Sequence, residues 1–484
     1  MEPELLIPPN HLLSLPRPDT SLGLELLAGL VDTTTLAAHD FDVDNRTGFM
    51  PPQPPLTRLP EEWEEWELVL EASRGLKLGS RPDLTDEDKE ISRIWRGQVQ
   101  QLPILPTENL KKSEVVVRRA HLVLSWILHF YIHTLPPSVS TVVIPAPLTV
   151  PLLQVCAELR LPPVLTYADT VLYNWALKKP QHSPVPNLSN LRSVQTFTGT
   201  QSEEEFYLTS ARMELRGTEA LELMRSTMDE AFVGDNIAMK RITSYLLTLA
   251  TVIADLKKLL LDVKEGCDPQ VFYNEVRPWF MGIDSGKRGW VFEGLELDET
   301  LEVPKELSGP SAGQSSLIHA LDIFLGVEEY SHSDKITGQA AERSHTFSSF
   351  SSTSIPTSSN PAKSAFLQRM QAYMPRHHRN FLNHLRNNPR PLRNIVMHAE
   401  NPQLLEAYNK AVMSLKELRD AHIVIVTLYI IIPAKQATAA QEEVEKERAD
   451  GKGGKESLKG TGGTDLVKFL KDVRNGTAGA LLTS

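Results

Sequence analysis

The feature that most restricts the fold of this chain is the helical spacing of apolar residues in its second half. In "GTEALELMRSTMDEAFVGDNIAMKRITSYLLTLATVIADLKKLLLDV" (residues 217–263), apolar side chains recur at steps of three and four, which places them on one face of a helix. Runs of alternating β-branched residues are scarce. The sequence therefore predicts an all-α protein. Its 484 residues, 41% of them hydrophobic, suffice for a real core and for two or three domains.

A polar stretch that contains several prolines, "NWALKKPQHSPVPNLSN" (174–190), marks the expected boundary between two domains. We expect a small, mostly helical N-terminal domain over residues 1–185 and a large helical domain over residues 186–484. Residues 331–365 are rich in serine and threonine and predict a disordered surface insertion. Residues 436–463 begin as a charged helix and become a glycine-rich loop, which we expect to be flexible.

Charge and cysteine content exclude several classes of function. The net charge of −11 argues against a general nucleic-acid binder, which needs a basic face. Two cysteines, Cys156 and Cys267, cannot form a disulfide framework or a four-cysteine metal site. The start, "MEPELLIPPN", lacks the pattern of a signal peptide, and no uninterrupted apolar run reaches the roughly 18 residues of a membrane span. We expect a soluble, cytoplasmic protein without a nucleic-acid or membrane partner.

One histidine stands inside a strongly apolar segment, "SLKELRDAHIVIVTLYIII" (414–432). On a helix it shares a stripe with apolar neighbours, and the members of this stripe are Leu415, Leu418, His422, Ile425, Val426 and Tyr429. Arg419 stands one turn before His422. The residues alone leave two interpretations open. His422 is a core histidine that hydrogen-bonds a carbonyl beside a snorkelling arginine, or it is the axial ligand of a haem iron.

Motifs for other chemistries are missing from the sequence or ambiguous. The chain has no HExxH zinc motif, no paired CxxC and no CxxCH for covalent haem. "GKGGKES" is not a phosphate-binding Walker loop, because no serine or threonine follows directly after the lysine. "KGTGGTD" (459–465) is compatible with an anion-binding loop or with a flexible linker.

Six segments between residues 161 and 471 resemble, in order, segments of the indoleamine 2,3-dioxygenase family. The segments are "LPPVLTYADTVLYNW" (161–175), "FYNEVRPW" (272–279), "SAGQSSLIHALDIFLG" (311–326), "YMPRHHRNFL" (373–382), "LRDAHIVIVTLYIIIPA" (418–434) and "KGTGGTDLVKFLK" (459–471). The serine-rich insertion and the weaker similarity near the N-terminus look like a fungal-type member.

This resemblance implies an all-helical large domain that binds haem b without covalent attachment, and a smaller domain that covers the pocket. It implies a dioxygenase that inserts both atoms of O₂ across the indole C2–C3 bond of L-tryptophan, giving N-formylkynurenine on the kynurenine route to NAD. An electron donor would keep the haem iron ferrous, and we expect a monomer. The alternative is a haem-binding member with weak catalysis that acts mainly as a sensor or interaction protein, which the 331–365 insertion would favour.

On the haem side, the resemblance assigns His422 as the proximal iron ligand. Arg419 matches the arginine that supports the haem propionates, and Asp322 matches its acidic partner. A buried cation without a partner would be costly, so we expect these two side chains to form an ion pair. Ser311 and Ala312 match a loop over the haem edge.

On the substrate side, Arg277 matches the residue that grips the substrate carboxylate, a task suited to the guanidinium fork. Ser210 matches the distal hydroxyl, and Thr461 matches a lid residue that closes over the substrate. The remaining pocket residues that the resemblance assigns are Tyr167, Thr170, Val171, Phe206, Phe272 and Tyr273. His377 and His378 are adjacent and point to different helix faces, so we assign them to packing.

Overall fold

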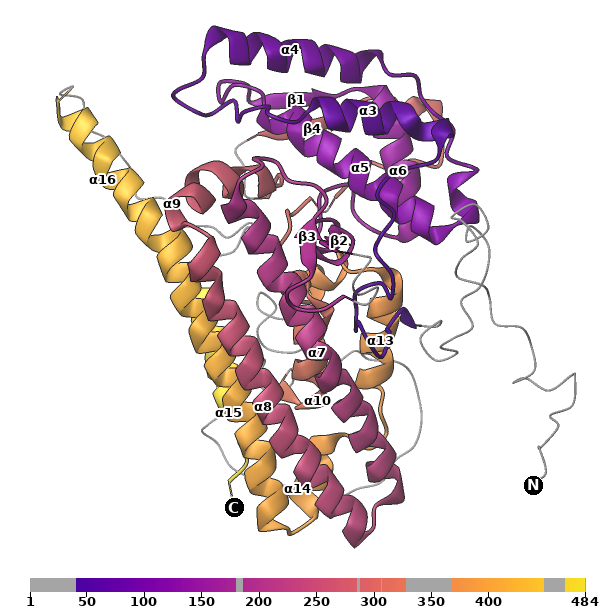
Figure 1. Cartoon of the computed structure of the whole chain (residues 1–484), viewed down its shortest axis with the longest axis vertical. Coiled ribbons are helices and arrows are strands. Elements are labelled where there is room, and N and C mark those ends of the chain that lie inside the picture. The colour runs from indigo at the N-terminus through magenta and orange to yellow at the C-terminus, as the bar shows by residue number, and fades with distance from the viewer. Residues whose placement is uncertain are drawn as a thin grey trace, which may run out of the picture.

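The computed structural model describes residues 41–179, 186–284, 288–305, 307–327, 367–447 and 466–483. Within these residues nearly all regular structure is helical, and the strands are short segments in two separate pairs. The predicted all-α class is therefore confirmed. Figure 1 shows a body of long helices below a layer of shorter ones.

Three long helices lie side by side in the body: α7 (Gln201–Val233), α8 (Asn236–Gly266) and α15 (Pro402–Val426). The middle helix, α8, packs along both of the others. Its contacts come from a fully buried apolar stripe that includes Leu249, Ile253 and Leu256, and Leu415 of α15 belongs to the same core. The shorter elements around them are α9 (Pro269–Val271), α10 (Ser316–Phe324), α13 (Arg376–Arg386), α14 (Leu392–His398), α16 (Ile432–Glu447) and α17 (Leu466–Gly479).

The helical pattern over residues 217–263 belongs to two helices rather than one. Gly234 ends α7 with a φ of +72°, a left-handed conformation that glycine adopts without strain. Asp235 then caps α8, because its carboxylate accepts a hydrogen bond from the backbone N–H of Ala238 at 2.7 Å. The chain thereby reverses direction, and α7 and α8 pack as antiparallel neighbours.

The N-terminal layer is built around α5 (Glu114–His133), in which every residue from 119 to 132 is buried. Trp95 packs edge-on against Phe130 of α5, with 6.1 Å between ring centroids. The other elements of the layer are η2 (Glu61–Trp63), α3 (Glu64–Ala72), α4 (Asp86–Gln101), η3 (Leu110–Lys112) and α6 (Ala146–Leu159).

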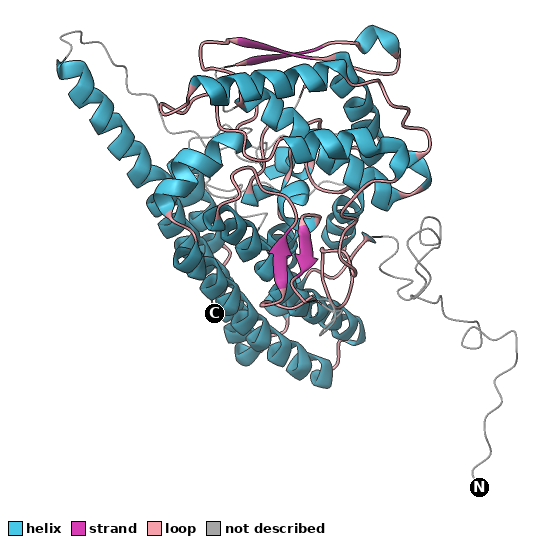
Figure 2. Ribbon diagram, turned by 45° about the horizontal axis from the view of Figure 1, so that its top comes forward, coloured by secondary structure: helices cyan, strands magenta, loops and turns pink. Residues whose placement is uncertain are grey.

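The strands form two separate pairs (Figure 2), and the first of them joins distant parts of the chain. β1 (Thr141–Ile144) runs parallel to β4 (Gly289–Phe292), and β2 (Trp175–Leu177) runs antiparallel to β3 (Leu191–Ser193). The second pair flanks the expected domain boundary at residue 185, which itself lies outside the described residues and stays a prediction. The 331–365 insertion also lies outside them. Residues 436–447 continue α16, as expected for the start of the 436–463 segment.

Three turns of π-helix interrupt the α-helical pattern, and each lies in a segment singled out in the sequence. They are η4 (Ala168–Leu172), η5 (Phe272–Val276) and η9 (Thr427–Ile431). The remaining short turns are of 3-10 type: η6 (Arg277–Phe280), η7 (Leu295–Leu297) and η8 (Ala312–Gln314). A π-turn inserts one extra residue into a helix and often marks a functional site.

The segment after η6 and the segment before η8 touch through their backbones. The N–H of Ile283 donates to the carbonyl of Leu307 at 2.9 Å. A Cβ at Gly309 would lie 1.7 Å from the carbonyl oxygen of Phe280, and one at Gly282 would lie 1.9 Å from that of Leu307. Only glycine fits at either position, so this contact fixes the two loops relative to each other.

Two helices within the described residues are long and apolar enough to cross a membrane by length and composition alone: α5 and the continuous run Pro402–Ala439. The apolar window of α5 is 83% buried inside the protein. In the second run, α15 packs along α8 and α17. Buried core helices pass the same test, so this finding leaves the expectation of no membrane partner a prediction.

Gly309→Ala should destabilise the protein by on the order of 3 kcal/mol, because the added methyl group overlaps the Phe280 carbonyl. Gly97→Ala in α4 is the matched control, since a Cβ there meets nothing within 4 Å. It should be neutral or stabilise by up to about 1 kcal/mol. Urea unfolding of both variants measures the difference, and equal stabilities would show that the two loops do not touch as described.

Candidate functional site

His422 lies near the C-terminal end of α15, in the apolar stripe expected from the sequence. Leu415, Leu418 and Ile425 of the stripe are buried, whereas His422 itself is partly exposed. Burial of the ring, together with the positive charge of Arg419, lowers the pKa of His422 to about 4. The imidazole is therefore neutral at pH 7, which is the form that binds iron.

The two interpretations of His422 now differ in their support. A core histidine would hydrogen-bond a carbonyl, but within the described part of the chain the His422 ring makes no hydrogen bond. Because the ring is partly exposed, it can bind a group from outside the protein. The described residues also hold no cluster of three or more histidine, cysteine or acidic side chains. This donor set fits a haem, whose iron needs one protein ligand, rather than a bare metal ion.

The predicted ion pair between Arg419 and Asp322 is confirmed. Nη2 of Arg419 donates to both carboxylate oxygens of Asp322, at 2.5 and 2.6 Å, and Nη1 donates to the hydroxyl of Thr477. Both side chains of the ion pair are about one-tenth exposed, at 11% and 10%. The contact joins α15, α10 and α17 one turn before His422. The role of the pair beside a haem propionate stays a prediction.

A chain of aromatic rings joins α7 to η9 on the other side of His422. The ring centroid of Phe272 lies 4.5 Å from that of Phe206 on α7 and 5.8 Å from that of Tyr429 on η9. The Tyr429 hydroxyl donates to the carbonyl of Cys267 at 2.6 Å. Tyr429 was expected only as a member of the apolar stripe, although its position two turns after His422 was a usable signal.

Two sets of contacts connect α7 to α15 and its continuation η9, and in sequence Ser210 and His422 each lie between these two sets. Along α7, Ser210 follows Phe206 of the aromatic chain and precedes Glu214, which hydrogen-bonds Ser315 just before α10. Along α15 and η9, His422 follows Arg419, which binds α10, and precedes Tyr429 of the aromatic chain. The order is reversed, so the two segments run in opposite directions, and Ser210 and His422 each lie between the two sets of contacts. Both Ser210 and His422 are partly exposed.

Arg277 is positioned by a π-turn followed by a proline. Its backbone N–H donates to the carbonyl of Phe272, five residues earlier. In a regular α-helix this N–H would donate to the carbonyl of Tyr273 instead. Pro278 lacks an N–H and its ring crowds the carbonyl of Asn274, which explains the wider turn. Arg277 is partly exposed, its guanidinium carbon lies 5.7 Å from the Tyr273 ring centroid, and burial lowers the pKa of Arg277.

The wall that contains Tyr167, Thr170 and Val171 belongs to η4 and the residue before it, and all three side chains are buried. The Tyr167 N–H donates to Oε1 of Gln314 at 2.8 Å, which ties this wall to η8. The Thr170 hydroxyl donates within its own turn, to the Thr166 carbonyl at 3.2 Å.

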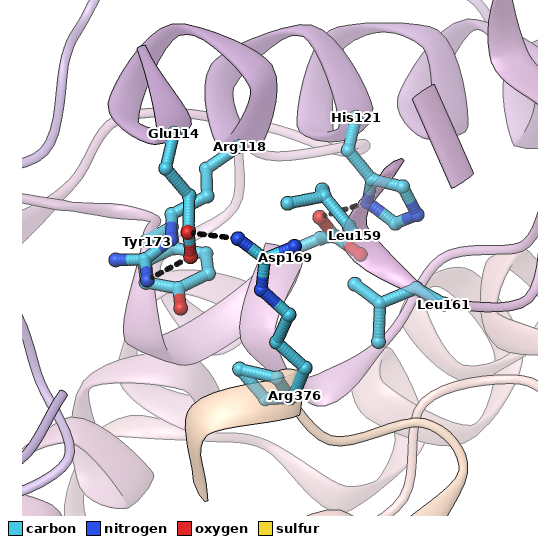
Figure 3. A pocket seen from close by; sticks show the side chains of 9 residues that line it. Glu114, Arg118, His121, Leu159, Leu161, Asp169, Tyr173 and Arg376 are labelled. Carbon is cyan, nitrogen blue, oxygen red and sulfur yellow. Dashed lines mark hydrogen bonds and ion pairs between the residues drawn. The ribbon is translucent and has the colours of Figure 1, made fainter. Parts of the chain in front are cut away.

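Behind this wall, Asp169 forms a buried ion pair with His121 of α5, at 2.8 Å (Figure 3). Burial lowers the pKa of His121, but the neighbouring Asp169 carboxylate outweighs it and raises the pKa well above its usual value. The other oxygen of Asp169 accepts two hydrogen bonds from Thr166, at 2.6 and 2.8 Å. The N-terminal layer therefore holds η4 in place. Figure 3 also shows Glu114 between Arg118 and Arg376, which links α5 to α13.

The loop that contains Ser311 and Ala312 lies at the start of α10. The Ser311 hydroxyl accepts from the N–H of Gly313 at 3.2 Å, and Ala312 is exposed. Nε2 of Gln314 donates to the carbonyl of Gly309 at 2.9 Å, and this hydrogen bond ties the two ends of the loop together. Thr461 lies outside the described residues.

The two adjacent histidines of α13 have the packing positions expected from the sequence. His377 lies 3.2 Å from the Glu114 carboxylate, and His378 is fully buried beside Phe49, with 4.8 Å between ring centroids. Within the described residues neither belongs to a metal-binding cluster.

Glu214 is the residue that sequence reasoning missed. It lies one turn after Ser210 and is only 2% exposed. Its Oε1 accepts from the Tyr167 hydroxyl at 2.8 Å and from the Ser315 hydroxyl at 2.7 Å, whereas Oε2 has no partner among the described residues. Burial raises the pKa of Glu214 to about 7. A spacing of four from Ser210 placed it on the same face, but an acidic residue in a helix usually faces solvent.

Together these features define a helical protein with a neutral imidazole on α15, a serine hydroxyl on α7, and a guanidinium and aromatic rings at η5. Residues 37–480 match the family model for indoleamine 2,3-dioxygenase. This chain belongs to the indoleamine 2,3-dioxygenase family, whose members are haem-dependent dioxygenases.

Relatives from different organisms support this membership. The chain is 32% identical to the rat protein named indoleamine 2,3-dioxygenase 1, over 92% of this chain and 96% of the relative. It is 31% identical to the indoleamine 2,3-dioxygenase of Saccharomyces cerevisiae, over 89% and 90% of the two chains. It is also 29% identical to a Fusarium equiseti protein named 6-hydroxytryptophan 2,3-dioxygenase, over 94% and 100%.

Asp322→Asn should cost roughly 3 kcal/mol of unfolding free energy, because it leaves the buried Arg419 without its anion. Asp255→Asn is the matched control. Asp255 pairs with Arg216 at 2.9 Å but is 47% exposed, so its loss should cost less than about 1 kcal/mol. Urea unfolding measures both, and similar losses would contradict the structural role of the Asp322 pair.

Proposed function

We propose that this protein inserts both atoms of O₂ across the indole C2–C3 bond of L-tryptophan and releases N-formylkynurenine, a step towards NAD. The observation that carries the proposal is that His422 and Ser210 each lie between the same two sets of contacts that connect α7 to α15 and η9. One of these sets contains Phe272, and Arg277 ends the π-turn that begins at Phe272. A cytoplasmic location, a monomeric state and an external electron donor are part of the same proposal.

His422 would hold the haem iron, and the Arg419–Asp322 pair would support the haem propionates. When bound in the ferrous state, haem supplies the redox chemistry by which O₂ reacts with the indole ring. His422 is suited to this role because its imidazole is neutral and its helix is fixed by a buried ion pair. Ser311 precedes α10, the helix that contains Asp322.

The side chains of this protein would bind and orient the substrate. Arg277 forms a charge-assisted bond with the substrate carboxylate, and Phe206 and Phe272 pack against the indole. Ser210 on α7 contributes a hydroxyl group to the wall of the substrate pocket. The protein would therefore promote the reaction mainly by orienting the substrate and by excluding water from the site.

A second candidate substrate is a ring-hydroxylated tryptophan. The support for it is the Fusarium relative named for 6-hydroxytryptophan, which matches over its whole length. The sensor alternative rested on the 331–365 insertion, which lies outside the described residues.

The holoenzyme under reducing conditions should convert L-tryptophan and O₂ to N-formylkynurenine, measured by its absorbance and by mass spectrometry. The same assay with 6-hydroxytryptophan separates the two candidate substrates through their kcat/KM values. His422→Ala is the negative control, since it should lose the haem absorption band of a histidine complex. Absence of product from either substrate at millimolar concentration, with the haem fully loaded, would refute the proposed activity.

Arg277→Lys should raise KM by roughly ten- to a hundredfold with a smaller effect on kcat, because lysine keeps the charge but loses the guanidinium fork. Arg288→Lys is the matched control. Burial also lowers the pKa of Arg288, and its guanidinium donates to the carbonyls of Ile132 and Leu135, away from the site. Steady-state kinetics should show an unchanged KM for this control. An unchanged KM in the Arg277 variant would remove Arg277 from substrate binding.

A further inference from the structure

Three histidines follow one side of the buried helix α5, and each contacts a segment outside the helix. His121, His129 and His133 stand eight and four residues apart. His121 pairs with Asp169 of η4 (Figure 3), and Nε2 of His133 lies 3.0 Å from the carbonyl oxygen of Met281, just after η6. His129, between them, contacts two segments at once, and none of the proposed binding roles uses it.

The two ring nitrogens of His129 bind the backbones of two different segments. Nδ1 lies 2.6 Å from the carbonyl oxygen of Trp279, and the N–H of Leu165 donates to Nε2 at 3.2 Å. A carbonyl oxygen only accepts and a backbone N–H only donates, so Nδ1 carries the hydrogen and Nε2 carries none. The ring is fully buried, and burial lowers the pKa of His129 to about 4. The imidazole is therefore held as one neutral tautomer at pH 7.

The segments that His129 joins contain residues with different proposed roles in substrate binding. Trp279 belongs to η6, which begins at Arg277, the proposed partner of the substrate carboxylate. Leu165 lies two residues before the wall that consists of Tyr167 and η4, which we call the η4 wall. Leu165 lies outside the helices and strands, and its N–H bonds to the His129 ring instead of to a neighbouring turn. One buried ring therefore sets the distance between η6 and the η4 wall.

The neighbouring contacts of the N-terminal layer hold one of these segments each. His121 binds η4 through its ion pair, and His133 binds the residue after η6. Arg81 pairs with Glu275 of η5 at 2.9 Å, but the two side chains are 29% and 34% exposed. An ion pair open to solvent contributes little to positioning. The ring of His129 differs from these contacts because both segments meet on one rigid, buried group.

We propose that His129 is a positioning residue that holds η6 and the η4 wall at a fixed separation, so that one substrate molecule binds through its carboxylate and its indole ring together. This inference rests on the proposed indole substrate. His129 acts through the backbones of Trp279 and Leu165 and not through contact with the substrate. A shift of about 1 Å in a binding group is enough to weaken a site of this kind strongly.

Asparagine and glutamine at position 129 separate the two contacts, because their side chains differ in length by one carbon atom. The amide of asparagine reaches the position of Nδ1, so His129→Asn keeps a donor for the Trp279 carbonyl and loses the acceptor for Leu165. The amide of glutamine reaches the position of Nε2, so His129→Gln keeps an acceptor for Leu165 and loses the donor for Trp279. Each variant removes one hydrogen bond from the same buried place, so a merely structural role predicts the same effect for both.

The test is the dissociation constants of L-tryptophan and tryptamine for the ferric holoenzyme, measured by calorimetry without turnover. Tryptamine keeps the indole ring and the amine but lacks the carboxylate. His129→Gln releases η6, so the Kd of L-tryptophan should rise about tenfold, as expected for one lost hydrogen bond, and the Kd of tryptamine should not change. His129→Asn releases the η4 wall, so the Kd of both ligands should rise by a similar factor.

A matched control and a measurement on the unmodified protein accompany these variants. His378 of α13 is also fully buried, burial also lowers its pKa to about 4, and its ring packs beside Phe49. His378→Gln should leave both Kd values unchanged, and melting temperatures show whether each variant is folded. In the unmodified holoenzyme, the N–H of Leu165 should exchange with solvent as slowly as the amides of α5, although it lies outside a helix.

An equal effect of His129→Gln on the two ligands, no effect of either variant at position 129, or rapid exchange of the Leu165 N–H would overturn the inference. The expected pattern of Kd values without product formation would refute the proposed activity and leave the role of His129 standing. An unmodified protein that binds neither ligand would refute both.

Discussion

The ion pair between Arg419 and Asp322 is the interaction on which the arrangement of the site depends. Taking two charges out of water is costly, and only good geometry and further hydrogen bonds offset that cost. Arg419 meets both requirements, with two bonds to Asp322 and a third to Thr477. Because Nη2 of Arg419 donates to both carboxylate oxygens of Asp322, the pair fixes the position of α15 against α10. His422 stands one turn further along the same helix, so its place is fixed as well.

The three π-turns show how the fold brings site residues together at the ends and bends of its helices. An extra residue in a turn shifts every later side chain around the helix axis and weakens the regular hydrogen-bond pattern. Here each turn is held by contacts from another element. Asp169 and His121 secure η4, and the Tyr429 hydroxyl ties η9 to the chain just before η5. The surrounding layers therefore stabilise local geometry that the segments would not adopt alone.

Sequence reasoning identified what depends on periodicity and on matched motifs. It placed His422 on an inward face, and it paired Arg419 with Asp322 across 97 residues. It did not identify the π-turns, because one added residue barely alters a pattern of threes and fours. It treated residues 217–263 as a single pattern, although Gly234 and Asp235 end one helix and begin the next. The choice between a core histidine and a ligand required knowing what surrounds the ring.

Two buried glutamates of α7 show why Glu214 could be recognised only in the structure. Both are acids within a helix, and both accept a hydrogen bond from a tyrosine. Both oxygens of Glu203 accept hydrogen bonds, from Phe197, Thr198 and Tyr207. These bonds lower the pKa of Glu203, but burial outweighs them and raises it. Glu203 connects the start of α7 to the preceding loop. Glu214 leaves one oxygen without a partner. Oε2 of Glu214 can therefore take up a proton without losing a hydrogen bond to the described residues, whereas neither oxygen of Glu203 can.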